Sequence, residues 1–205
     1  MLRLVLLCLG LLLAVPMARA DAVADCNQAR DRDRCIRGCT LYIEQNQDPE
    51  GLAHAYHNRG VAHMQKGNLE RAIADYNKVL ELRPHYADAY YNRGVAYARK
   101  GDTERAITDY TKAIENNRRD AGAYHNRGDA YRGKGDFVRA IADYTRAIEL
   151  DPNDVALYNS RGLAYAGNGD YAYALADATK AATLALAASG TDTSKAKSAV
   201  KGRAP

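Results

Sequence analysis

The chain has 205 residues, enough for one ordinary domain. Its formal charge of +4 falls to +2 once Arg3 and Arg19 are set aside with an N-terminal leader, and so small a surplus does not predict nucleic acid as a partner. After the leader, no stretch predicts stable membrane insertion, because Asp177 and Lys180 interrupt the alanine-rich segment 172–188.

Residues 1–20 have the pattern of a secretory signal peptide. Arg3 provides a positive start, an apolar run follows over 4–15, and the tripeptide at 18–20 is a small-x-small cleavage site. We therefore expect an exported protein, periplasmic or secreted, whose mature chain starts at Asp21. Export permits a disulfide among the three cysteines that remain, and the odd count leaves one thiol over.

Residues 21–52 predict a degenerate pair of short helices with a break near 46–49. If Cys26 occupies the place that Gly60 has in the next copy, it faces the second helix near Gly38, and Cys39 is the following residue. A Cys26–Cys39 disulfide is then geometrically plausible and closes a loop of about 14 residues. Cys35, one turn earlier, is the competing partner. A redox-active pair is disfavoured because no Cys-x-x-Cys spacing is present.

From residue 53 the sequence repeats with a period of 34 residues. The tripeptide Asn-Arg-Gly stands at 58–60, 92–94 and 126–128, and becomes Ser-Arg-Gly at 160–162. Such a period predicts a repeat architecture rather than a single-core globule. The four copies are expected at 53–86, 87–120, 121–154 and 155–188.

Each copy has two halves with helical apolar spacing, divided by a glycine followed by Asn or Asp. The glycine is expected to close the first helix in a left-handed cap, and the polar residue to cap the second helix. Glycines such as Gly94 and alanines such as Ala106 are expected to face each other, small against small, with tyrosines such as Tyr110 filling the space beside them. Residues 189–205 predict a disordered basic tail. The alanine-rich last helix then needs a cover, either from this tail or from a partner.

The pattern Tyr-x-Asn-Arg-Gly-x-Ala-Tyr, then Gly, then Ala-Ile-x-Asp-Tyr, resembles the tetratricopeptide repeat over 53–188 and more weakly over 22–50. The resemblance implies an all-α, right-handed solenoid of antiparallel helix pairs. It also implies a concave groove, lined by the first helices, that holds peptides or partner proteins.

The resemblance places one asparagine per repeat in that groove, at Asn58, Asn92 and Asn126. Because an amide both donates and accepts, a regular row of amides can bind the backbone of an extended peptide. The alternative is that each amide bonds a neighbouring helix as part of the repeat. Specificity is expected from the residues that precede the row, which are His57, Tyr91, His125 and Asn159.

A second series places an arginine 16 residues before an aspartate on the paired helix, and a structural ion pair is the favoured interpretation. The pairs are Arg59 with Asp75, Arg93 with Asp109, Arg127 with Asp143, and Arg161 with Asp177.

Nothing in the sequence predicts a catalytic residue set, a cofactor or a metal. His54 and His57 share one helix face, but a metal site needs three or four convergent ligands. We therefore expect an exported, non-catalytic scaffold that binds an extended segment or a helix of another protein. The alternative is an assembly chaperone or accessory subunit that works through its solenoid ends, including by self-association.

Overall fold

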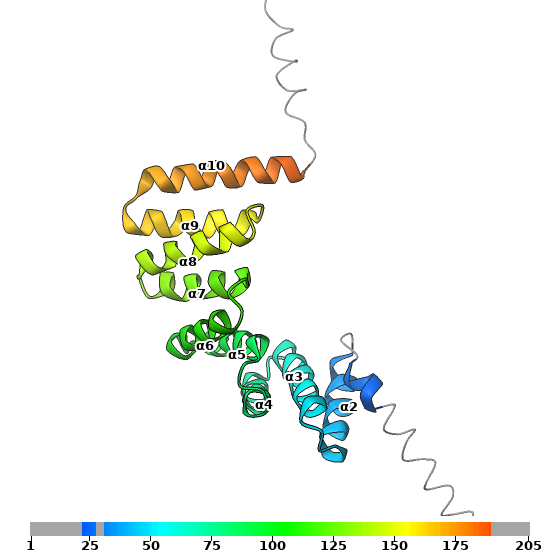
Figure 1. The fold of residues 1–205 in the computed structure, drawn as a ribbon. Helices are drawn as coiled ribbons and strands as arrows, with labels where there is room; N and C mark the ends of the chain where they lie inside the picture. Colours follow the sequence, from blue (N-terminus) through cyan, green and yellow to red (C-terminus); the bar gives the residue numbers. More distant parts are fainter. Residues whose placement is uncertain (1–21, 28–30, 190–205) are drawn as a thin grey trace, which may run out of the picture. The chain divides into compact units, whose positions relative to one another are not determined.

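The computed structural model describes residues 22–27 and 31–189, and all the regular secondary structure in these ranges is helical (Figure 1). The expected signal peptide, and the expected tail beyond Ser189, lie outside the described residues. The chain divides into two compact units, Met1–Arg118 and Arg119–Pro205. Within the described ranges, no helix combines the length and the apolar character needed to cross a membrane.

The first unit contains a short helical segment at 22–26 and five longer helices, each packed against the next. They are α2 (Arg32–Gln45), α3 (Pro49–Gln65), α4 (Leu69–Leu82), α5 (Ala87–Arg99) and α6 (Thr103–Asn116). Helix α3 begins four residues before the expected repeat boundary at 53. The reason is local: Asp48 accepts from the backbone N–H of Gly51 at 2.8 Å, and proline suits the first helical position.

The second unit contains four helices, which also pack in sequence order. They are α7 (Ala121–Gly133), α8 (Phe137–Leu150), α9 (Val155–Asn168) and α10 (Tyr171–Ala188). Figure 1 shows α9 and α10 lying side by side at the C-terminal end of this unit, and α10 is the longer of the two. Both units thus have the helix-pair construction of an α-solenoid.

A glycine in the left-handed conformation makes the turn within each pair. These residues are Gly67, Gly101, Gly135 and Gly169, with φ between 76° and 88°. The polar residue that follows caps the next helix in only two pairs, where Asp102 and Asp136 accept from a backbone N–H at 3.1 Å. The expected side-chain cap is wrong for Asn68 and Asp170. Asp170 instead accepts from the Asn168 amide at 2.7 Å.

The helices of each pair approach closely through a glycine and a tyrosine, which corrects the expectation of small residues against small ones. A Cβ added to Gly60, Gly94 or Gly128 would lie 2.8 Å from a ring carbon of the tyrosine on the paired helix. The tyrosines that cover these glycines are Tyr76, Tyr110 and Tyr144, and each is at most 2% exposed. Glycine therefore makes room for an aromatic ring, whose burial contributes most of the local apolar contact.

Candidate partner-binding site

One polar side chain lies near the middle of the first helix of each pair. These side chains, here called the ladder positions, are half-buried and belong to Asn58 of α3, Asn92 of α5, Asn126 of α7 and Ser160 of α9. A helix-pair repeat of constant length places the same position on the same face of each first helix. The periodicity therefore carries over into a repeated polar position within each unit.

The ladder positions bond to neighbouring helices. In the first unit, the amide nitrogen of Asn92 donates to His57 Nε2 across 3.2 Å. In the second unit, His125 Nε2 lies 3.0 Å from the Ser160 hydroxyl. The residue before one ladder position thus bonds to the next ladder position. The Asn92 contact uses one of two amide N–H groups, so it orients the amide and is compatible with binding a peptide as well.

Aromatic packing fixes the two histidines. The His57 ring lies between Tyr76 and Tyr86, with centroids 6.0 and 5.5 Å away. Burial lowers the pKa of His57, which favours the neutral ring whose Nε2 can accept from Asn92. The His125 ring lies 5.7 Å from that of Tyr144. Both side chains are therefore held rigidly beside the ladder positions.

The other two predicted specificity residues differ from the histidines. The ring of Tyr91 leans on Tyr110 of the paired helix, with 6.1 Å between centroids. Asn159 is exposed on α9. The structure thus joins His57 to Asn92 and His125 to Ser160, and it leaves Asn159 apart on the surface.

A pocket adjoins the first ladder position and is not evident from the sequence. Its volume is about 420 Å³, and its lining includes Asn27, Cys35, His57, Asn58 and Gln65. The segment at 22–27 forms one wall, where the Asn58 amide donates to Asn27 Oδ1 across 3.1 Å. The only available signal was the position of Asn27 directly after Cys26, which becomes informative once the disulfide is assigned.

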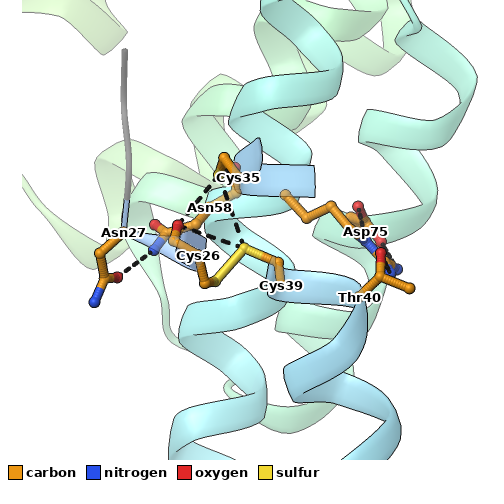
Figure 2. Close-up of a disulfide and its surroundings, with 8 residues drawn as sticks. Cys26, Asn27, Cys35, Cys39, Thr40, Asn58 and Asp75 are labelled. Carbon is orange, nitrogen blue, oxygen red and sulfur yellow. Dashed lines mark hydrogen bonds and ion pairs between the residues drawn. A yellow bond between two sulfur atoms is a disulfide. The ribbon is translucent and has the colours of Figure 1, made fainter. Parts of the chain in front are cut away.

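Figure 2 shows how the cysteines hold this segment. Cys26 and Cys39 form a disulfide with 4.4 Å between their Cα atoms. Cys26 lies against Gly38 of α2, where there is no room for a Cβ. Cys35 is a buried thiol that donates to the Cys26 carbonyl oxygen at 3.2 Å, and burial raises its pKa. A raised pKa disfavours the reactive thiolate, which suits a structural cluster.

All four arginine–aspartate pairs lie within salt-bridge distance, with nitrogen to oxygen separations of 2.7–2.8 Å. Each is bidentate: in the second pair, Arg93 Nε and Nη2 donate to the two oxygens of Asp109. The aspartate side chains are only 5–8% exposed. Hydrogen bonds to Asp109 are the main reason that the pKa of Arg93 is raised. Removing one partner of such a buried pair typically costs about 3–5 kcal/mol.

The arginines also make a contact that the sequence did not predict. The remaining nitrogen, Nη1, donates to a side chain on the second helix of the preceding pair. The acceptors are Thr40 for Arg59, Asn77 for Arg93 and Thr145 for Arg161, at 2.6–3.1 Å. Each of these arginines therefore joins three helices and is committed to the scaffold.

Within the described ranges, no three His, Cys, Asp or Glu side chains gather to form a metal site. The polar groups that remain for recognition are those at and beside the ladder positions. They suit hydrogen bonding to a peptide backbone rather than covalent chemistry.

Comparison with known proteins identifies the repeat. A family model described as TPR repeat matches residues 60–101 and 128–169. Two models described as tetratricopeptide repeat match residues 87–120 and 109–142. Together the matches run without a gap from 60 to 169. None of the curated proteins matches the chain.

Several solved structures have a similar fold. A crystal structure of MamA is 29% identical, covers 78% of this chain and 91% of its own, and has a TM-score of 0.73. MamA from Desulfovibrio magneticus RS-1, from residue 41 to its end, is 23% identical, with coverages of 86% and 97% and a TM-score of 0.75. YrrB, described as a TPR protein with an unusual peptide-binding site, is 20% identical, with coverages of 78% and 80% and a TM-score of 0.67. The last two likenesses concern the fold alone.

Proposed function

Because the chain belongs to the tetratricopeptide repeat family, we propose that it is a non-catalytic scaffold that binds an extended segment or a helix of another protein along its first helices. The observation that carries this proposal is the fixed orientation of the ladder positions. Amides that are already held in place lose little conformational freedom when a peptide binds. YrrB shows that the fold can carry a peptide-binding site.

Affinity must come from more than the ladder. A net hydrogen bond contributes about 0.5–1.5 kcal/mol, so three amides supply only a few kcal/mol. The pocket beside Asn58 offers further contact area, and its walls combine the apolar Val61 and Ala62 with polar side chains. We assign His57, Tyr91, His125 and Asn159 to selectivity because each precedes a ladder position.

Recovery of partners from an envelope extract tests the ladder. The test variant carries Asn58→Ala, Asn92→Ala and Asn126→Ala. The matched control is Asn116→Ala, which removes an amide contact of the same kind, to His85 Nδ1 at 3.2 Å, away from the ladder. We expect wild type and control to recover the same proteins and the triple variant to lose them while its circular dichroism stays unchanged. Equal recovery by all three contradicts the proposal.

We also propose that the protein works outside the cytoplasm. The Cys26–Cys39 disulfide supports this location, because disulfides persist in oxidising compartments. Intact mass of the protein purified from the envelope fraction is expected to correspond to a chain that starts at Asp21 and has one free thiol. A full-length mass in the cytoplasmic fraction contradicts export.

A further inference from the structure

Helix α10 exposes a continuous apolar surface. The side chains of Tyr171, Leu175 and Leu186 are 72%, 70% and 50% exposed, and Ala178 and Ala182 are exposed between them. At 100° per residue these five positions fall within one sector of about 80°. We call this surface the α10 stripe. Monomeric proteins rarely leave such a stripe in contact with water.

The repeat register shows what this stripe is built to receive. The equivalent positions in α8, 34 residues earlier, are Phe137, Ile141 and Ile148, and α9 covers them. The Phe137 ring lies directly over Gly167 of α9. Ile148 is only 8% exposed and packs in the cluster that contains Leu157 and Tyr158.

The same positions in α4 give the same result in the other unit. Leu69, Ile73 and Leu80 are half-buried, and α4 packs against α5. In each described example, the first helix of the next pair covers this face. The α10 stripe is therefore a surface of helix-receiving shape.

The 16 residues that follow α10 do not supply a suitable cover. Segment 190–205 has four small or aliphatic residues, namely three alanines and Val200, and contains no leucine or aromatic residue. It also carries four basic side chains. The covering helix α9, in contrast, presents Leu157 and Tyr158. A segment of this composition buries too little apolar area to offset the entropy of ordering it.

A second copy of the chain meets the requirements. The stripe contains no charged residue, so two stripes can face each other without opposing like charges. Asp177 lies off the stripe, paired with Arg161. The small side chains of Ala178 and Ala182 allow close approach at the centre. We propose that two copies associate through their α10 stripes, packed antiparallel about a two-fold axis near Ala178. This inference is independent of the ladder.

An isologous contact fits better than a head-to-tail one. A head-to-tail contact would place α10 against the N-terminal end of another copy. There the disulfide holds segment 22–26 against the protein, with Ala22 and Cys26 at most 5% exposed. Two-fold contacts are also the commonest form of self-association.

The size of the stripe sets the expected affinity. A helix of 18 residues is about 27 Å long. One helix face of this length offers less than the roughly 800 Å² per partner of a standard interface. We therefore expect a dimer with a dissociation constant in the micromolar range.

Sedimentation velocity of the full chain between about 1 and 100 µM tests the dimer. The mass of the wild type is expected to rise from monomer to dimer over this range. Leu175→Lys should remain monomeric, since it places a lysine in the apolar contact. Val138→Lys is the matched control, because Val138 is 69% exposed on α8 and lies outside the stripe. A wild type that stays monomeric, or a dimer that Leu175→Lys leaves intact, overturns the proposal.

Crosslinking locates the two-fold axis. In the full chain, Ala178→Cys should give a covalent dimer under mild oxidation, because the two copies of this residue lie near the axis. Ala176→Cys introduces an equally exposed thiol on another side of α10 and should not. Cys35 does not compete, since it is buried. Equal yields from the two variants overturn the proposed geometry.

Discussion

Two tyrosines in equivalent positions provide a test of how polar groups are satisfied in this fold. Tyr76 and Tyr144 are both 0% exposed. The Tyr144 hydroxyl donates to Asp129 Oδ1 at 2.7 Å and accepts from Arg132 Nε at 3.2 Å. Within the described residues, the Tyr76 hydroxyl has no hydrogen-bond partner. The residue equivalent to Asp129 in that repeat is Val61, which cannot accept a hydrogen bond.

The same substitution should therefore have opposite effects. A hydrogen bond to a charged group is worth about 1.5–3 kcal/mol, so Tyr144→Phe should lower the free energy of unfolding by this amount. A buried hydroxyl without a partner costs about 1–3 kcal/mol. Tyr76→Phe should therefore leave the free energy of unfolding unchanged or raise it by about 1 kcal/mol.

Urea denaturation monitored by circular dichroism measures both changes. Because the chain has two compact units, hydrogen exchange in α4 and α8 should report each unit separately. In a Val61→Asp background, Tyr76→Phe should become destabilising, and the double-mutant cycle then measures the new bond. If Tyr76→Phe destabilises the original protein as much as Tyr144→Phe does, the assignment of an unsatisfied hydroxyl is refuted.

Three further predictions concern packing, the disulfide and pH. Gly94→Ala should lower the free energy of unfolding by about 1–3 kcal/mol because its Cβ would meet the Tyr110 ring at 2.8 Å. Gly133→Ala, in open space, should raise that free energy by about 0.4–1 kcal/mol, and thermal melting measures both. Reduction of the Cys26–Cys39 disulfide should lower stability by about 3 kcal/mol, measured by urea midpoints with and without reductant. Burial lowers the pKa of His57, so the unfolded chain takes up a proton near pH 6.5 while the folded chain does not. Stability should therefore fall as the pH drops below about 6.5, and level off below the folded-state pKa.

Each prediction has its own control. A neutral Gly94→Ala variant would show that the helix pair can widen without cost. Mass mapping that finds three free thiols would refute the disulfide. His57→Gln should remove part of the pH dependence, and the rest is assigned to His63, whose pKa burial also lowers. An unchanged pH profile in His57→Gln would contradict the assigned burial.

The helix pairs could be predicted from sequence because their signals are local and repeated. The glycine before each second helix marks a left-handed turn, and 34 residues separate one example from the next. The side-chain caps were predicted less well, because Asp170 has a competing donor in Asn168 that the other copies lack. Local chemistry that is specific to one copy is averaged away when all copies are aligned.

Contacts between repeats were harder to predict. The bond between His57 and Asn92 joins residues 35 positions apart, and the sequence shows only that both are polar. Choosing between Cys35 and Cys39 required the angular position of each on α2, since the two are one turn apart. The pocket at Asn58 depends on that choice, because the disulfide brings Asn27 to its wall.

The arginines that join three helices affect how unfolding spreads along the chain. In a linear array, each repeat has its own stability, and each junction adds a coupling energy. The bond from Arg93 to Asp109 lies within one repeat, whereas its bond to Asn77 crosses a junction. Substituting Asn77 should therefore weaken the junction and leave the repeats on either side intact. The acceptor is threonine at two junctions and asparagine at another, so each junction can acquire its own coupling energy through a single side chain.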